Sequence, residues 1–425
     1  MPNIKSIHAY EIIDSKGLPT IEGRLTLDDD KEVITSIPAS LLSEKKTIID
    51  LKDEDPHRFN GMGVSHAVSY INDLISPKLK GASIYKQKEI DQWMIEADGT
   101  KNKSRLGGNT ILTVSQLIAK AGAKAQNLSD FKYLNYLYST YFKETISLDK
   151  IPSPIFNMIN GGKHANNKLD FQEFTVVPSS SFTFSKAYQI GVEILYELKK
   201  VLEYRNATTA VGEEGGFSPN LTTNLDALEI LNETIVQRQL KMGVDIFLGL
   251  DLASTSYYLN KLYTIKDKNH SLRKEEYFKF IEFILDNYSI MFLEDLFADE
   301  DWDGWSNLVN KLPSTIYIVG DDLIRMNKER LIKSIKSNSI STITIKPSQA
   351  GTILEVLELI SIARSNKIGY IVASGLSETN DTFVADLAVA VQSEFVKFGS
   401  TVRGERVCKY NRLWQIEREE LYVKK

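Results

Sequence analysis

The sequence predicts an α/β protein in which a smaller α+β domain precedes a (β/α)8-type barrel. The chain has 425 residues, more than the roughly 250 that such a barrel takes. Four short apolar runs of strand length each end directly before a charged residue: Asp251, Glu294, Asp321 and Lys346. Each gap between runs has room for a helix that crosses back to the next parallel strand. In such a barrel the chemistry lies at the C-terminal strand ends, so these four charges should share one mouth.

The first part of the chain has strand candidates followed by helix candidates. Within residues 4–36, the best strand is 21–27, where apolar and polar side chains alternate. Helical periodicity then covers residues 64–79, 86–96, 109–125 and 130–142. Strands followed by helices predict an α+β domain over residues 1–149.

Strand and helix patterns alternate over residues 150–425, which we assign to the barrel domain. A short strand is expected at 174–177, and a helix with one apolar face at 187–201. Residues 211–216 contain three glycines, which favours an irregular loop. The remaining elements expected are helices at 225–236, 274–286, 328–336 and 352–365, and a further strand at 368–372.

Charge and cysteine content narrow the class of protein. The chain carries 51 Lys and Arg against 56 Asp and Glu, a formal net charge of −5, and we find no basic block. No nucleic-acid partner is therefore expected. The single cysteine, Cys408, excludes an intrachain disulfide and indicates a reducing compartment. Residues 1–20 lack a signal-peptide core, and no run approaches the ~20 apolar residues of a membrane span, so we expect a cytoplasmic protein.

Three of the strand-end residues are carboxylates. Asp251, Glu294 and Asp321 are hard oxygen ligands of the kind that Mg²⁺ prefers. Zinc is not expected, because the chain has one cysteine and its five histidines are scattered. Any one of these acids alone would be read as a solvated strand end, but three on successive strands favour a metal site.

The fourth strand-end residue is a lysine. Lys346 near such a metal can act as a general base, and the alternative is an ion pair with one of the acids. Glu173 and Glu214 flank the expected helix at 187–201, on segments that can reach the mouth of the barrel. A protonated carboxyl group there could serve as a general acid.

Ordered motifs along nearly the whole chain resemble the enolase family. Residues 14–20 read DSKGLPT, similar to the family's DSRGNPT, and residues 106–112 read LGGNTIL, similar to LGANAIL. Residues 160–165 and 172–174 match NGGxHA and QEF, and residues 212–216 resemble GDEGG. LED at 293–295, GDDL at 320–323 and KPSQAGT at 346–352 follow in family order, and SETNDTF at 377–383 resembles SGETEDTF with one residue missing.

The resemblance implies a role for each matched residue. It implies that Asp251, Glu294 and Asp321 bind Mg²⁺, and that Lys346 removes the proton next to the substrate carboxylate. Glu214, with Glu173 beside it, would protonate the departing hydroxyl. His164, Lys397 and Ser377 would contact the substrate, a small phosphorylated carboxylate. The family is usually dimeric or built from dimers, which implies a homodimer or higher homo-oligomer.

Two segments depart from the family pattern. Residues 38–47 read PASLLSEKKT where the family's catalytic lid reads PSGASTGxHE, and Leu42 takes the place of the serine that binds a second Mg²⁺. Residues 374–377 read SGLS in place of SHRSG, the stretch that grips the substrate phosphate. Lys45, Lys46 or Arg325 could supply the missing charge.

Three functions remain open on the sequence. The first is the glycolytic hydro-lyase reaction, the reversible dehydration of 2-phosphoglycerate to phosphoenolpyruvate. The second keeps the same proton abstraction on another 2-substituted carboxylate. The third is a non-catalytic binding or surface-displayed protein. The retained acids and lysines favour an enzyme, whereas the altered lid and phosphate segment favour the second or third.

Overall fold

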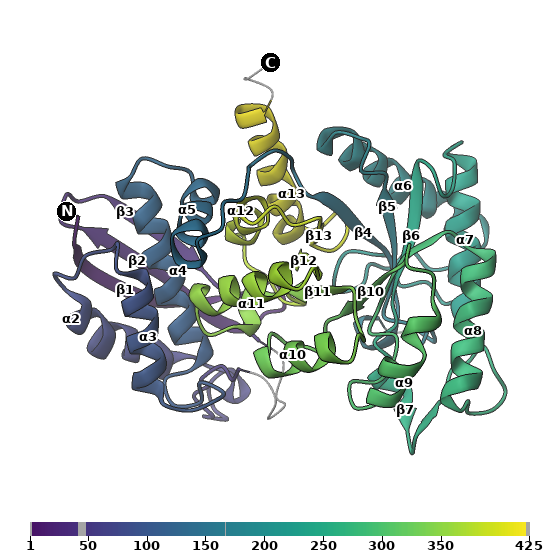
Figure 1. The fold of residues 1–425 in the computed structure, drawn as a ribbon, viewed down its shortest axis with the longest axis horizontal. Helices are drawn as coiled ribbons and strands as arrows, with labels where there is room; N and C mark the ends of the chain where they lie inside the picture. Colours follow the sequence, from purple (N-terminus) through teal and green to yellow (C-terminus); the bar gives the residue numbers. More distant parts are fainter. Residues whose placement is uncertain (1, 41–47, 166, 422–425) are drawn as a thin grey trace. The chain divides into compact units, whose positions relative to one another are not determined.

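The computed structural model describes residues 2–40, 48–165 and 167–421, and it divides the chain into two compact units (Figure 1). The first unit comprises Met1–Lys150, Ile345–Ile362 and Val372–Ser393, and the second comprises Ile151–Thr344, Ala363–Ile371 and Glu394–Lys425. Two later segments thus join the N-terminal part of the chain. The boundary that the sequence places between residues 149 and 150 stays a prediction.

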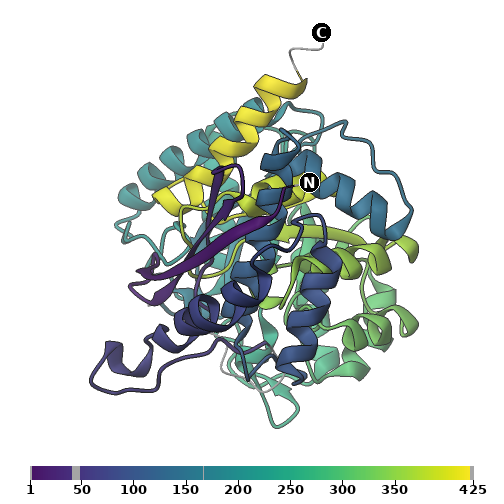
Figure 2. The ribbon, with the colours of Figure 1, turned by 90° about the vertical axis from the view of Figure 1, so that its left-hand side faces the viewer.

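The first unit contains a three-stranded antiparallel sheet with helices beside it (Figure 2). Its strands are β1 (Ile4–Ile13), β2 (Pro19–Leu27) and β3 (Glu32–Ser36), in the order β1-β2-β3. Three of the predicted helices are present as α3 (Gln87–Asp98), α4 (Gly108–Ala125) and α5 (Asp130–Phe142). The segment predicted at 64–79 is helical but interrupted: α1 (Ser65–Ser69), a π turn at Tyr70–Ile75 and α2 (Ser76–Leu79).

Strand β2 and helix α4 approach each other closely. Ile21, Leu25 and Leu27 of β2 are buried, as their alternation predicts. A Cβ atom at Gly23 would lie 2.6 Å from Cγ2 of Thr113 on α4, so only glycine fits between sheet and helix.

A closed barrel of eight strands confirms the predicted fold class. Its order is β10-β11-β12-β13-β4-β5-β6-β9. The strands are β4 (Ser153–Asn160), β5 (Glu173–Pro178), β6 (Ile246–Asp251), β9 (Ile290–Glu294), β10 (Tyr317–Gly320), β11 (Thr342–Ile345), β12 (Gly369–Ala373) and β13 (Phe395–Lys397). The hairpin β7 (Tyr258–Leu259) and β8 (Leu262–Tyr263) lies outside the barrel order.

One barrel strand departs from the parallel arrangement that the sequence predicts. β5 pairs antiparallel with both β4 and β6, whereas β6, β9 and β10 pair in parallel. In the described residues of the connection from β4 to β5, 161–165 and 167–172, there is a short 3-10 turn at Gly162–His164 and no crossover helix. Without a crossover the chain can return only as an antiparallel neighbour, so β5 begins at the end where the parallel strands finish.

The helices that follow the strands agree with the sequence pattern. α6 (Phe184–Tyr204) and α7 (Asn224–Gln237) both lie between β5 and β6. α8 (Lys274–Asn287), α10 (Lys328–Lys336) and α11 (Ile353–Ser365) match the predicted ranges within one residue at each end. The helices that were not predicted are α9 (Trp302–Asn307), α12 (Phe383–Ala390) and α13 (Gly404–Ile416).

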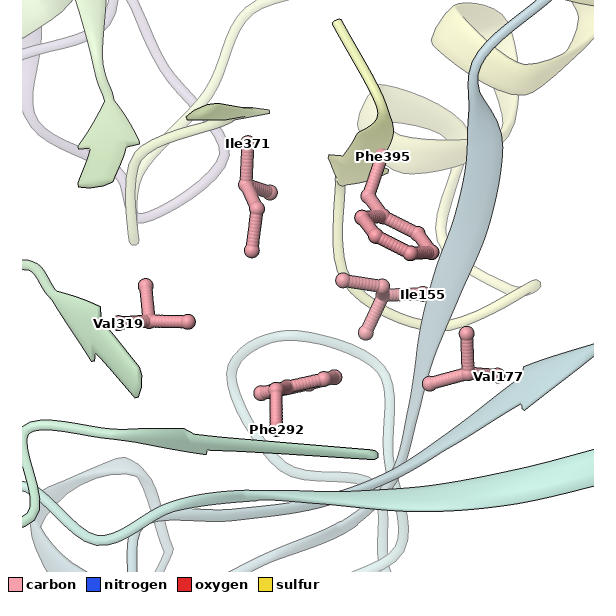
Figure 3. Packing of buried hydrophobic residues seen from close by; sticks show 6 residues of the cluster. All are labelled: Ile155, Val177, Phe292, Val319, Ile371 and Phe395. Carbon is pink, nitrogen blue, oxygen red and sulfur yellow. The ribbon is translucent and has the colours of Figure 1, made fainter. Parts of the chain in front are cut away.

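A cluster of buried apolar side chains from six strands fills the barrel interior (Figure 3). Its members are Ile155, Val177, Phe292, Val319, Ile371 and Phe395. Side chains two residues apart on a strand share a face. The residues two positions after Phe292 and Phe395 are Glu294 and Lys397, so the packed core directs these charged side chains into the same interior, at its open end.

A buried carboxyl group in the first unit links α3 to the start of α11. Asp91 is fully buried and accepts hydrogen bonds from Nε2 of Gln87 (3.0 Å) and the backbone N–H of Leu354 (3.2 Å). Burial raises the pKa of Asp91 to about 7, although the side-chain hydrogen bond with Ser115 and these two hydrogen bonds oppose the rise.

Because the pKa of Asp91 is raised on folding, the folded protein binds more protons than the unfolded chain between about pH 4 and pH 7. The stability that this group contributes is therefore fully present below about pH 4 and is lost as the pH rises through 7. Asp91→Asn removes this titratable group. We therefore expect the unfolding free energy of the variant, relative to that of the unmodified protein, to rise between pH 5 and pH 8 by on the order of a few kcal/mol. Urea unfolding at both pH values measures this difference, and the exposed Asp73→Asn is the control. A pH-independent difference would contradict the assignment.

Candidate active site

Four buried ionisable side chains meet at one end of the barrel. Glu173 opens β5, Asp251 and Glu294 close β6 and β9, and Lys397 closes β13. None of the four is more than 5% exposed. In the strand ladders Glu173 pairs with Asp251, and Asp251 with Glu294, so three carboxylates lie on adjacent strands.

Lys397 supplies the positive charge among these carboxylates. Its Nζ lies 2.7 Å from Oε2 of Glu294, 3.2 Å from Oδ2 of Asp251 and 3.5 Å from Oε2 of Glu173. Burial alone would lower the pKa of Lys397, but the negative charges of Glu173, Glu294 and Asp251 raise it well above its usual range. The ammonium group therefore stays charged and neutralises part of the acid cluster.

The third predicted metal ligand, Asp321, is placed by the neighbouring Asp295. Asp321 directly follows β10, and its backbone N–H donates to Oδ1 of Asp295 (3.1 Å). Oδ2 of Asp295 accepts from the N–H of Asp322 (2.8 Å). Burial, followed by the charges of Asp322, Asp321, Asp251 and Glu294, raises the pKa of Asp295 well above its usual range. The acids of all three strand ends thus lie within electrostatic reach of this one carboxyl group.

Hydrogen bonds fix the orientation of two of these carboxylate side chains, those of Glu294 and Asp251. Oγ1 of Thr344, on β11, donates to Oε1 of Glu294 (2.9 Å). The backbone N–H of Ala253 donates to Oδ1 of Asp251 (3.1 Å). Each carboxylate therefore keeps one oxygen on a protein donor and turns the other toward Lys397.

A second group of side chains, His164, Glu173 and Glu214, adjoins the first. His164 ends the short 3-10 turn after β4, and its Nδ1 lies 3.4 Å from Oε2 of Glu214 and 3.9 Å from Oε1 of Glu173. Nδ2 of Asn157, on β4, donates to Oε2 of Glu214 (3.0 Å).

The glycine-rich loop at 211–216 is present as predicted and holds Glu214 in place. The N–H of Gly212 donates to the carbonyl of Gly216 (2.7 Å), which closes a tight turn. Gly215 has φ 93°, a backbone conformation that favours glycine. The carbonyl of Glu214 accepts from the N–H of Ser400 (2.8 Å), which fixes the backbone of this residue from outside the loop.

The two glutamates differ in their tendency to hold a proton. Burial, and then the charge of Glu214, raises the pKa of Glu173 well above its usual range. Burial alone would also raise the pKa of Glu214, but the charge and the hydrogen bond of His164 bring it well below its usual range. The two directions mean that Glu173 keeps a proton more readily than Glu214.

Two of the predicted site residues belong to the other compact unit. Lys346 directly follows β11, and Ser377 lies in the loop after β12. Oγ of Ser377 donates to the carbonyl of Ala39 (2.7 Å), so its hydroxyl proton is used within that unit. The roles predicted for Lys346 and Ser377 stay predictions.

The sequence singles out Leu42 in the lid segment, and Lys45, Lys46 and Arg325 as possible sources of the missing charge. Leu42, Lys45 and Lys46 lie outside the described residues. Arg325 is 5% exposed; its Nε donates to the carbonyl of Asp322 (3.0 Å), and its guanidinium lies 3.4 Å from the carboxylate of Asp299. This arginine is thus already engaged within its own unit.

Three residues that orient the site carry no role in the sequence analysis. Asn157 holds Glu214, Thr344 holds Glu294, and Asp295 holds the turn that begins with Asp321. A polar residue inside an apolar strand, such as Asn157 or Thr344, is the signal that could have indicated them, because buried polar groups need partners.

Two protein-family models match the chain. One, described as the N-terminal domain of enolase, covers residues 4–134, and the other, described as the C-terminal TIM barrel domain of enolase, covers residues 149–423. Within the described part of the chain, no helix has both the length and the apolar character needed to cross a membrane.

Proposed function

This chain belongs to the enolase family, and from that premise we propose that it is a Mg²⁺-dependent hydro-lyase that dehydrates 2-phosphoglycerate to phosphoenolpyruvate, a reaction of glycolysis. The observation that carries the proposal is the pairing of two groups at one barrel end. One is an acid cluster around Lys397, and the other is the pair Glu173 and Glu214 beside His164, in which burial raises the pKa of Glu173. Dehydration next to a carboxylate needs both positive charge and a proton donor.

In this mechanism a lysine and a pair of glutamates move protons. Lys346 takes the proton from the carbon next to the substrate carboxylate. The Glu173–Glu214 pair then gives its proton to the hydroxyl on the adjacent carbon, which leaves as water while the double bond forms. The raised pKa of Glu173 supports this role, because an ordinary glutamate would carry no proton at neutral pH. Lys397 and His164 are the proposed substrate contacts.

The residues present fit a magnesium ion. Asp251, Glu294 and Asp321 offer carboxylate oxygens, and Asp251 and Glu294 each turn one oxygen toward the positive charge of Lys397. When bound, Mg²⁺ supplies positive charge that stabilises the negative charge building up on the substrate carboxylate. The protein's part is to hold these three acids on adjacent strand ends.

We expect Mg²⁺ to raise the melting temperature of the protein, because it binds only the folded acid cluster. At 100 times its Kd the gain is about 2.7 kcal/mol. Asp251→Asn should remove most of that gain, whereas Asp286→Asn, an exposed acid on α8, should keep it. Calorimetry with millimolar Mg²⁺ measures both. No binding by the unmodified protein at that concentration would refute the assigned ligands.

The function is tested by the formation of phosphoenolpyruvate from 2-phosphoglycerate with Mg²⁺, run beside an ordinary enolase. A rate that depends on Mg²⁺ and is lost in Glu214→Gln supports the proposal. No product together with no solvent exchange of the substrate proton would favour a non-catalytic binding or surface-displayed protein. The proposed location is the cytoplasm, and the proposed assembly is a homo-oligomer.

One observation favours a second candidate, the same proton abstraction on a different 2-substituted carboxylate. In the loop where the family grips phosphate, the N–H of Gly375 donates to Oε1 of Glu378 (2.8 Å). The loop thus binds its own carboxylate. Solvent exchange of the proton next to the carboxylate in unphosphorylated 2-hydroxy acids separates this candidate from the first.

A further inference from the structure

The first turn of α11 is held by side chains from two other helices of the same compact unit. The backbone N–H of Ile353 donates to Oγ of Ser115 on α4 (2.9 Å), and the N–H of Leu354 donates to Oδ2 of Asp91 on α3 (3.2 Å). The first N–H groups of a helix have no partner within the helix itself. The start of α11 therefore depends on two acceptors that lie far away in the sequence.

The two acceptors belong to one buried hydrogen-bond network. Asp91, Ser115 and Gln87 are all fully buried. Nε2 of Gln87 donates to Oδ1 of Asp91 (3.0 Å), and it also lies within hydrogen-bond distance of the carbonyl (3.0 Å) and Oγ (3.2 Å) of Ser115. Since a buried N–H group that loses its acceptor is costly, these contacts fix where α11 begins.

This turn continues directly from the segment that carries Lys346. The segment, residues 346–352, connects β11 to α11. Within it, the N–H of Gln349 donates to the carbonyl of Lys346 (2.9 Å), and the N–H of Ala350 donates to the carbonyl of Pro347 (2.9 Å). Lys346 therefore begins a short hydrogen-bonded turn that leads into the helix.

The end of the segment is closely packed. A Cβ atom at Gly351 would lie 2.7 Å from Cε of Lys103 and 2.7 Å from Oε2 of Glu355. Nζ of Lys103 lies 3.0 Å from Oε1 of Glu355, and the N–H of Glu355 donates to Oγ1 of the buried Thr352 (3.1 Å). A shift of the first turn of α11 should therefore be passed on to residues 346–351.

From these contacts we propose that Asp91 and Ser115 are positioning residues for Lys346, which they hold through the first turn of α11. The inference rests on the proposed function, in which Lys346 is the base. Neither positioning side chain can touch a substrate, because both are fully buried. Both act by fixing the segment, and a displacement of about 1 Å at a reacting group can cost ~100-fold in rate.

The test measures exchange of the carbon-bound proton of 2-phosphoglycerate in deuterium oxide with Mg²⁺. We expect Ser115→Ala to lower the maximal exchange rate about 10- to 100-fold, with the half-saturating substrate concentration unchanged. Ser76→Ala is the matched control, because Ser76 is also a buried serine of the first unit, and its Oγ accepts from the N–H of Ile7 (3.0 Å). Urea unfolding should show a similar loss of stability in both variants, and Ser76→Ala should exchange at the unmodified rate.

Two variants of Asp91 separate positioning from a general loss of stability. Asp91→Ala removes the acceptor of Leu354 and should lose as much rate as Ser115→Ala, which covers the case in which one of the two fails to fold. Asp91→Asn keeps an oxygen for that N–H. Oε1 of Gln87, which has no hydrogen-bond partner among the described residues, can turn to accept from the new amide. Asp91→Asn should therefore recover most of the rate. Losses no larger than that of Ser76→Ala, or no recovery in Asp91→Asn, would overturn the proposal.

A second readout does not depend on catalysis. Amide hydrogen exchange followed by mass spectrometry should show that a peptide covering residues 346–355 loses protection in Ser115→Ala and in Asp91→Ala, whereas a peptide from α6 keeps it. Unchanged protection of residues 346–355 in both variants would contradict the inference. If the unmodified protein exchanges no substrate proton, the proposed function fails, and the peptide measurement alone decides whether the two side chains hold this segment.

Discussion

Lys346→Ala is expected to reduce the exchange of the substrate's carbon-bound proton with deuterated solvent by about 10²- to 10⁴-fold, the range that a general base contributes. The residue directly follows β11, the strand on which Thr344 donates a hydrogen bond to Glu294. Lys397 cannot take over as the base, because three carboxylates raise its pKa and keep it protonated. Proton NMR of 2-phosphoglycerate in deuterium oxide measures the exchange.

Two variants make this result specific. Lys336→Ala removes an exposed lysine from the end of α10 and should exchange at the unmodified rate. Glu214→Gln should block the release of water yet still permit exchange, since the carboxyl pair acts after proton abstraction. If Lys346→Ala folds normally and exchange persists, the base is another residue.

Most of the barrel could be predicted from the sequence because its strands are nearly continuous apolar runs. Such runs are typical of strands buried on both faces. A charged residue marks the C-terminal end of each of β6, β9, β10 and β11. The direction of β5 could not be predicted, because it depends on how the chain turns between β4 and β5, where the described residues form no crossover helix. β13 has only three residues, too short for any periodicity, so Lys397 was identified by resemblance alone.

The chemical state of the site could not be predicted from the sequence either. Glu173 and Glu214 lie far apart in the chain, and nothing in their neighbours indicates which of them carries a proton. That division depends on His164 beside Glu214 and on the burial of both carboxyl groups. Likewise, the position of Lys397 next to Glu294 depends on how the strand ends pack in the closed barrel, and the sequence does not show that packing.

The loop after β12 is expected to limit the use of phosphorylated substrates. Gly375 and Leu376 have no side-chain donor for a phosphate oxygen, and the N–H of Gly375 already donates to Glu378. The loop is also fixed: the N–H of Glu378 donates to Oγ of Ser15 (3.0 Å), and its carbonyl accepts from the N–H of Ser15 (2.9 Å). A buried carboxylate here also repels a phosphate group, since Glu378 is 5% exposed.

We therefore expect kcat/KM for 2-phosphoglycerate to be at least ~100-fold below that of an ordinary enolase. Each charged hydrogen bond contributes about 1.5–3 kcal/mol, and the loss of two corresponds to about 10²- to 10⁴-fold. Replacing residues 375–377 with His-Arg-Ser-Gly should recover part of the deficit, because arginine binds phosphate through two parallel hydrogen bonds. An Ala-Ala-Ser-Gly loop of the same length is the control and should recover none. Steady-state kinetics of the three proteins decide the matter, and full activity of the unmodified chain would mean that other residues hold the phosphate.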